Sequence, residues 1–134
     1  MGLPAAKQND QITAVDIHIV MVPSVSGQTP VPLPHPFDGR LNANLSPNVN
    51  IMGLPAATVG SMATNQSPHL PLAPGVSFQV PPNNQGTVTM GSSSVNINGK
   101  PAARGTDSAQ TCADPVPNSG AKVVVASSTV MIGG

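Results

Sequence analysis

The sequence VNINGKPAAR, residues 95–104, recurs in similar form elsewhere in the chain, and this repetition predicts the architecture. A second copy reads VNIMGLPAAT at 49–58, and the chain opens with MGLPAAK at 1–7, which lacks the first half of the motif. The last five residues, VMIGG at 130–134, supply that half. The two ends of the chain therefore complete one motif. This predicts a closed object of three units, since an open solenoid would need terminal repeats of a different character.

The repeated motif divides the chain into three units within a single domain. Counted from the repeated glycine, the units span residues 2–52, 53–98 and 99–134. Sixteen prolines and thirteen glycines leave no clean helical window, because an interior proline removes a hydrogen-bond donor and clashes with the preceding turn. We predict an all-β fold, a small cone of three pseudo-threefold β-hairpin repeats with long Pro/Gly-rich loops, pinned by a metal ion.

Two segments, residues 86–99 and 121–134, contain β-branched residues on both sides of a Ser-rich turn, which is typical of a hairpin. We expect hairpins over residues 86–99 and 121–134, and the same plan over 41–53. Each hairpin leads to the repeated glycine, which supplies a positive φ or a close backbone approach. Proline then fixes the exit direction, and the small Ala-Ala pair leaves room for three copies to converge.

The composition limits both the core and the partners. Only Phe37 and Phe78 are aromatic, so the core is expected to be thin and to need a supplement. Five Lys and Arg residues provide no basic stripe for phosphates, and two phenylalanines provide little stacking surface for bases, so nucleic acid is not an expected partner. The apolar stretch ITAVDIHIVMV is interrupted by Asp16 and His18 and has no basic lead-in. We therefore expect a chain made in the bacterial cytoplasm without a signal peptide.

The three histidines and the single cysteine are candidate metal ligands: His18, His35, His69 and Cys112. His18 and His69 each lie twelve residues after the Ala-Ala pair of their unit, and Cys112 lies nine residues after the third pair. Three equivalent positions around an axis can meet at a point. His35 lies between two prolines in the longest unit, whose extra length is expected to form a loop that reaches over. A His₃Cys set closes a tetrahedral zinc sphere, so we predict one structural Zn²⁺ per chain.

Other functions and roles stay open at this point. A small zinc-dependent hydrolase would need an exchangeable water, which a fourth protein ligand leaves no room for. A Cys-His nucleophile pair would need a cleft and an oxyanion site that no motif marks. A fibre or adhesin fragment would form a homotrimer. The aspartates near the candidates fit partners that orient a ligand histidine and fit turns equally well, and we favour turns for Asp16, Asp107 and Asp114.

The tetrapeptide Pro101-Ala102-Ala103-Arg104 in KPAARGTD, the V-x-I-x-G lead-in and the closing SSTVMIGG together resemble the PAAR-repeat and PAAR-like spike-tip proteins. The resemblance covers essentially the whole chain. The other two copies read PAAK and PAAT, which favours a PAAR-like subgroup. The resemblance implies a β-rich cone that caps the trimeric central spike of a type VI secretion system or a related phage tail-like contractile injection particle. It also implies zinc near the apex, held by His18, His35, His69 and Cys112.

The same resemblance implies a structural, non-catalytic role and a set of partners. The tip is expected to sharpen the spike for puncturing the target envelope, with one tip on each spike trimer. Alone it is expected to be a monomer. Effectors docked near the tip and a transient contact with the target membrane belong to the implied partners, and the assembled tip is delivered outward with the particle.

Overall fold

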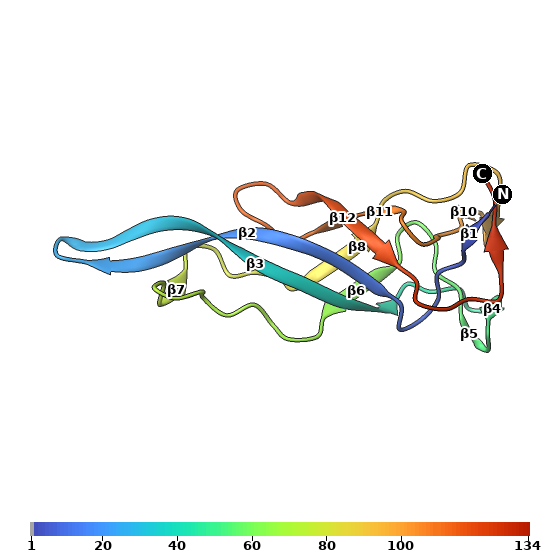
Figure 1. The fold of residues 1–134 in the computed structure, drawn as a ribbon, viewed down its shortest axis with the longest axis horizontal. Coiled ribbons are helices and arrows are strands. Elements are labelled where there is room, and N and C mark those ends of the chain that lie inside the picture. Colours follow the sequence, from blue (N-terminus) through green and yellow to red (C-terminus); the bar gives the residue numbers. More distant parts are fainter. Residues whose placement is uncertain (1) are drawn as a thin grey trace.

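Six antiparallel strands close into a barrel that forms the body of the molecule (Figure 1). The computed structural model describes residues 2–134, which contain strands and no helix, as predicted. The barrel strands are β2 (Gln11–Ser24), β3 (Gly27–Ala43), β6 (Met62–Asn65), β8 (Gln85–Val88), β11 (Ser108–Thr111) and β12 (Asn118–Val124). They follow one another in this order, and β12 pairs back onto β2. Closure of this kind protects the strand edges inside one chain.

Six two-residue strands form three further antiparallel pairs at the end of the molecule where the chain begins and ends. They are β1 (Leu3–Pro4) with β13 (Met131–Ile132), β4 (Asn50–Ile51) with β5 (Leu54–Pro55), and β9 (Asn96–Ile97) with β10 (Lys100–Pro101). We call this end the base. The expectation that the two ends of the chain complete one motif is confirmed, because Leu3 pairs with Ile132 and Pro4 with Met131.

The predicted units each contribute two neighbouring strands to the barrel. The first unit supplies β2 and β3, the second supplies β6 and β8, and the third supplies β11 and β12. The division at 2–52, 53–98 and 99–134 is compatible with these pairs and stays a prediction. None of the described residues forms a helix of the length and apolarity that crossing a bilayer requires.

The repeated glycines lie in the turns of two base hairpins. Gly53 and Gly99 both have φ of 79°, so of the two alternatives expected there the positive φ is the one observed. The residues before them, Met52 and Asn98, both have φ of 53°. Two successive central residues with positive φ are the mark of a type I′ turn, whose twist matches that of the flanking strands. The glycine therefore sits inside a tight hairpin.

The structure corrects the longer hairpins predicted over residues 86–99, 121–134 and 41–53. β8 pairs with β6 and β11, and β12 pairs with β11 and β2, so the partners are distant in sequence. The Ser-rich segments instead carry the chain from the barrel to the base. Ser92 shows how: its Oγ accepts hydrogen bonds from the backbone N–H groups of Ser94 and Val95, at 3.2 and 2.9 Å, which bends the chain without reversing it.

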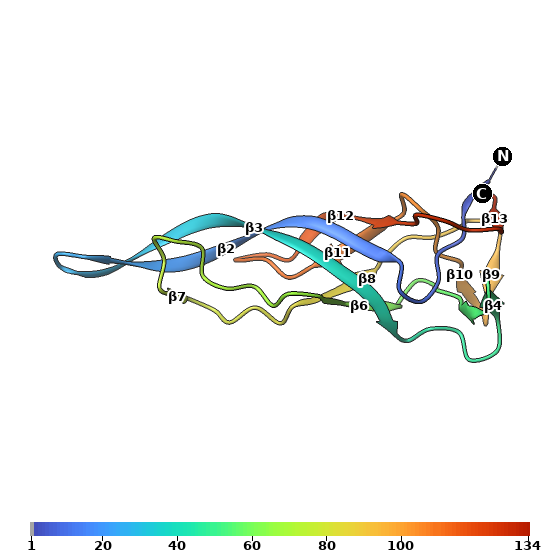
Figure 2. The same cartoon turned by 60° about the horizontal axis from the view of Figure 1, so that its bottom comes forward.

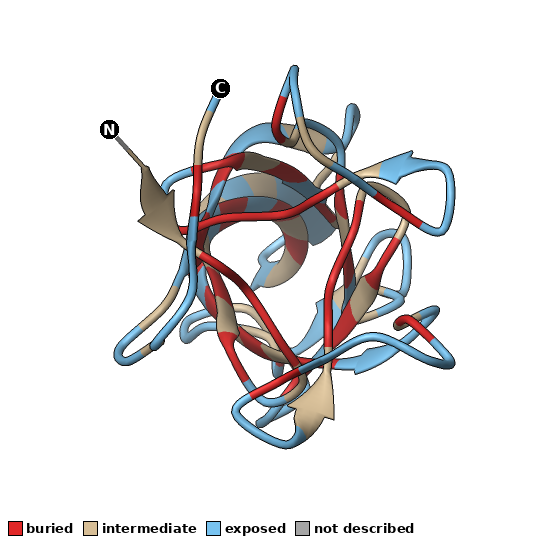
Figure 3. Ribbon diagram, turned by 90° about the vertical axis from the view of Figure 1, so that its right-hand side faces the viewer, coloured by how far each residue is buried: buried red, intermediate tan, exposed pale blue. Residues whose placement is uncertain are grey.

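The three Ala-Ala pairs converge between the barrel and the base. All six alanines are fully buried: Ala5, Ala6, Ala56, Ala57, Ala102 and Ala103. Backbone hydrogen bonds join one alanine of each pair in a closed ring. The N–H of Ala6 donates to Ala103 O at 2.9 Å, that of Ala57 to Ala6 O at 3.0 Å, and that of Ala103 to Ala57 O at 3.0 Å. Seen along the molecule, the buried segments form the sides of a triangle (Figure 3).

Two apolar clusters fill the interior, and both are thin, as the composition predicts. The barrel cluster contains Ile12, Phe37 and Leu41, and most of its other members are Ala and Val. The base cluster contains three isoleucines, Ile51, Ile97 and Ile132, packed against the first alanine of each Ala-Ala pair.

A single long hairpin, made by β2 and β3, projects from the barrel away from the base (Figures 1 and 2). The two strands pair without interruption from Gln11↔Arg40 to Ser24↔Gly27. β7 (Ser77–Phe78) pairs with β2 partway along it. The extra length of the first unit therefore forms this hairpin, and His35 lies in β3. The predicted loop around His35 is wrong.

Replacing Ala57 with leucine tests the convergence of the alanines. The added side chain has no space inside the triangle, so we expect Ala57→Leu to lower the free energy of unfolding by about 3 kcal/mol. The exposed Ala126 is a matched control, and Ala126→Leu should change stability by less than about 0.5 kcal/mol. Chemical denaturation measures both. Equal stabilities for the two variants would contradict tight packing at the ring.

Candidate metal centre

A cluster of polar side chains lies where the long hairpin leaves the barrel. β2 contributes Asp16 and His18, His69 lies in the segment after β6, and Cys112 directly follows β11. Residues two apart on a strand project to the same face, so Asp16 and His18 both point inward. Asp16 is 0% exposed and His18 1% exposed, His69 is buried, and Cys112 is half-buried.

The spacing of these four side chains fits a tetrahedral metal ion. One ligand atom from each lies within 4.8 Å of the others. Cys112 Sγ is 3.5 Å from His18 Nε2 and 3.6 Å from Asp16 Oδ2, and His69 Nε2 is 3.2 Å from Asp16 Oδ2. In a tetrahedral zinc site, bonds of about 2.1 Å to N or O and about 2.3 Å to S put neighbouring ligand atoms about 3.3–3.6 Å apart. The cluster can therefore hold a metal ion.

Neighbouring groups orient the cluster. His18 Nδ1 faces Asp114 Oδ2 at 3.1 Å, which favours the tautomer that leaves Nε2 free on the side of Cys112. Asp16 Oδ1 accepts hydrogen bonds from Thr111 Oγ1 and, at 3.3 Å, from Asn118 Nδ2. A buried carboxylate needs such partners, since burial without them is costly. The second carboxylate oxygen of Asp16 stays directed at the cluster.

Burial shifts the pKa of two members of the cluster, Cys112 and His69. It raises the pKa of the Cys112 thiol to about 11, and the nearby Asp16 carboxylate adds to the shift. It also lowers the pKa of His69, because the imidazolium loses its hydration, and this outweighs the hydrogen bond that His69 donates to the Asp16 carboxylate. His69 is therefore kept in the neutral form that metals bind, whereas Cys112 has to lose a proton when a metal binds.

His35 lies beside this cluster and is committed to the backbone. Its Nδ1–H donates to Leu33 O at 2.9 Å, and its Nε2 accepts from the N–H of Leu72 at 3.2 Å. Its ring centroid is 5.5 Å from that of His18 and 5.6 Å from that of His69. The structure thus gathers three of the four predicted ligands, with Asp16 as the fourth side chain. The set His18, His35, His69 and Cys112 itself stays a prediction.

The three aspartates differ in role. Asp107 lies at a turn, as we favoured. Asp114 lies in a bend and also faces His18. The turn interpretation is wrong for Asp16, which lies within β2. The spacing Asp16-x-His18 could have indicated that Asp16 belongs to the site, because in a strand it places both side chains on one face.

Arg104 of the repeated motif acts in the structure as a buried anchor. Its Nε and Nη2 donate to the two carboxylate oxygens of Asp107 at 3.1 and 2.9 Å, and its Nη1 donates to Gly133 O at 3.1 Å. The fork geometry of the guanidinium suits this bidentate contact. The corresponding turn of the first unit contains the ion pair Lys7–Asp10, with N···O of 3.1 Å. These pairs hold the base and offer no reactive group.

Comparison with known proteins bears on the C-terminal part of the chain. The family model of the PAAR motif matches residues 79–134, a segment that includes β8 to β13 and Cys112. Among curated proteins, none matches the chain. The resemblance to PAAR-repeat proteins is therefore confirmed by the family model over residues 79–134.

The identity of the fourth ligand can be tested with two variants. We expect Asp16→Asn to weaken metal binding at least about tenfold, because the amide is a poorer ligand. His35→Ala should change the affinity less than about threefold, since its nitrogens already bond to the backbone. Competition with a chromophoric chelator measures both affinities. The opposite ranking would place His35 in the site and Asp16 outside it.

Proposed function

Starting from the PAAR motif of residues 79–134, we propose that this chain is a zinc-stabilised, non-catalytic tip that caps the trimeric spike of a contractile injection machine. The machine is a type VI secretion system or a related extracellular particle, and the tip sharpens its spike for puncturing the target envelope. The observation that carries the proposal is the motif itself, together with the closed triangular ring into which its alanines fold.

The base supports a docking role. Its three short strand pairs, of which β4–β5 and β9–β10 are hairpins, are arranged around the axis of the alanine ring, so one chain presents three similar elements at one end (Figure 3). A trimeric partner offers three equal surfaces around an axis, which one such chain can meet at once. Two of the base strand pairs expose methionines, Met52 in the turn between β4 and β5 at 49% and Met131 in β13 at 59%, which provide adaptable apolar contacts.

The position of the polar cluster supports a stabilising metal. A metal ion bound by Asp16, His18, His69 and Cys112 would join the long hairpin to two segments that are far apart in the sequence. Nitrogen, oxygen and thiolate ligands in a tetrahedral arrangement suit Zn²⁺. In small metal-dependent folds a structural zinc contributes on the order of 10 kcal/mol, which would offset the thin core.

The proposed mechanism is mechanical, and the residues described here act by resisting deformation. The base takes up axial force, the closed barrel transmits it through backbone hydrogen bonds, and the continuous ladder of β2 and β3 carries it to the hairpin end. Arg104 and Lys7 hold the turns at the base by ion pairs. Zinc would keep the root of the hairpin from separating from the barrel under load.

A zinc-dependent hydrolase is the second candidate, favoured by one observation. A groove of about 180 Å³, lined by His18, Cys112 and Asp114 among others, opens beside the cluster. Hydrolysis would require a water on the metal, and X-ray absorption distinguishes the two cases. Four protein ligands support the structural role, and a metal-bound water would support the hydrolase.

The capping role is tested by mixing the chain with a purified spike trimer. Native mass spectrometry should show a monomer alone and one chain per trimer in the complex. Met52→Asp combined with Met131→Asp should weaken capping at least about tenfold, because the charges would be desolvated at the interface. Met90→Asp, at a methionine that is 61% exposed outside the base hairpins, is the control. A stable homotrimer, as a fibre fragment would form, would contradict the proposal.

The metal is tested through Cys112. We expect about one zinc per chain, and we expect Cys112→Ser to lower zinc content and the melting temperature together, the latter by about 10 °C. Wild-type protein treated with a chelator is the reference, and it should melt near the temperature of the variant. Unchanged zinc content in Cys112→Ser would remove Cys112 from the site.

A further inference from the structure

The projecting hairpin has no charged side chain over most of its length. Residues 17–37 contain no Asp, Glu, Lys or Arg. Residues 66–85, whose β7 pairs with the hairpin, contain none either (Figure 2). The two histidines of the hairpin, His18 and His35, are buried. The exposed surface of these two segments is therefore formally uncharged, and the neighbouring Asp114 carboxylate is 15% exposed and faces His18.

One face of the hairpin is apolar and exposed. Residues that lie opposite one another in antiparallel strands project to the same side. Four such pairs form the outer face of the hairpin: Val15↔Pro36, Ile17↔Pro34, Ile19↔Pro32 and Met21↔Pro30. Val15 is 61% exposed, Ile17 is 41% exposed, and all four prolines are exposed. The residues between them, such as Asp16 and His35, point inward.

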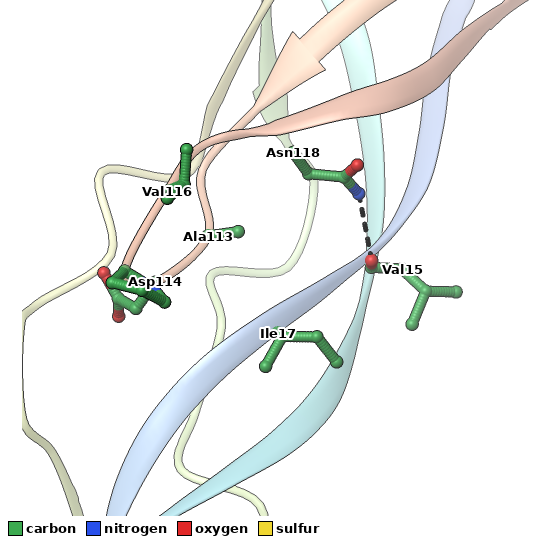
Figure 4. Close-up of a pocket in the computed structure, with 7 residues that line it drawn as sticks. Val15, Ile17, Ala113, Asp114, Val116 and Asn118 are labelled. Carbon is green, nitrogen blue, oxygen red and sulfur yellow. Dashed lines mark hydrogen bonds between the residues drawn. The ribbon is translucent and has the colours of Figure 1, made fainter.

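A shallow groove extends this outer face toward the barrel. It has a volume of about 370 Å³, and five of its seven lining residues are apolar: Val15, Ile17, Ala113, Pro115 and Val116 (Figure 4). The other two are Asn118 and Asp114, and the Asp114 carboxylate faces His18. Val116 is 68% exposed. The apolar surface thus continues from β2 onto the segment between β11 and β12.

The free edge of β3 lacks hydrogen-bond donors beside this face. The carbonyl groups of Ile17, Ile19 and Met21 accept bonds from Asp114, Gln79 and Val76 on the side of β2 away from β3. These residues are therefore non-hydrogen-bonded partners of the prolines opposite them, whose nitrogen atoms face the free edge of β3. Proline has no N–H, so this stretch of the edge offers only carbonyl acceptors.

We propose that the outer face of the hairpin binds the boundary between headgroups and acyl chains of a lipid bilayer, and that it does so without the force of a contracting sheath. This proposal rests on the tip function proposed above, and it adds to that function the residues that contact the membrane. An uncharged surface enters this boundary without desolvating an ion, and an edge without N–H groups leaves no donor unsatisfied there. The edge carbonyls can remain hydrated, so the contact is interfacial.

The same features disfavour a protein partner on this face. Strand addition to β3 would need N–H donors from Pro30 to Pro36, and the prolines remove them at alternate positions. A polar protein surface would find no charge on the outer face to fix its orientation. Acyl chains need neither feature.

Flotation with phosphatidylcholine vesicles tests the proposal on the isolated chain. We expect binding that changes less than about twofold when anionic phosphatidylglycerol or salt is added, because no charge contributes. Val15→Asp, on the outer face, and Val25→Asp, at the fully exposed hairpin end, should weaken binding at least about tenfold. Met90→Asp is the matched control, since Met90 is 61% exposed like Val15 and lies outside the hairpin. It should bind within about twofold of the wild type.

Three results would overturn the lipid contact: wild-type protein that does not float, binding that requires anionic lipid, or equal weakening by Met90→Asp. Capture of a soluble protein through the outer face, without vesicle binding, would also overturn it. Capping of the spike trimer is measured separately on the same variants. A chain that caps the trimer and ignores vesicles would refute only the lipid contact, and a chain that binds vesicles and fails to cap would refute only the tip function.

Discussion

The ring of backbone hydrogen bonds among Ala6, Ala57 and Ala103 joins the three parts of the chain at the junction of barrel and base. Each alanine donates to one neighbour and accepts from the other, so no segment can leave without breaking two bonds. Strands can approach this closely only where side chains are small, which is why the core is sparse at its centre. The strand pairs of the base extend from one side of the ring and the barrel from the other, so the ring positions both parts of the molecule.

Local rules made much of the fold predictable. Proline and glycine excluded helices, and the repeated glycines were expected to supply a positive φ or a close backbone approach. The two half-motifs at the ends of the chain were expected to complete one motif, and β1 does pair with β13. The hairpin over 86–99 was predicted wrongly because the Ser-rich segment was interpreted as a turn that reverses the chain. Only the tertiary structure shows that β8 pairs with β6 and β11. The prolines around His35 led to the prediction of a loop there. They are tolerated in β3 because each nitrogen faces a free edge.

The candidate site could be predicted only in part. Register with the repeats singled out His18, His69 and Cys112, which the structure brings together. Asp16 was assigned to a turn because its strand was not recognised, and the need to pair a fully buried carboxylate becomes visible only with the fold. His35 is close enough to belong to the site, but its nitrogens bond to Leu33 and Leu72. Those bonds depend on backbone positions that no spacing in the sequence encodes.

The single long hairpin breaks the near-symmetry of the base, since only the first unit extends into one. If the base binds a partner with threefold symmetry, the molecule has three almost equivalent orientations, related by rotations of a third of a turn. The ring of alanines does not favour one of them over the others. A population of assembled particles would then be a rotational mixture. An image reconstruction that imposed threefold averaging would keep the base sharp and blur the hairpin into a featureless stub.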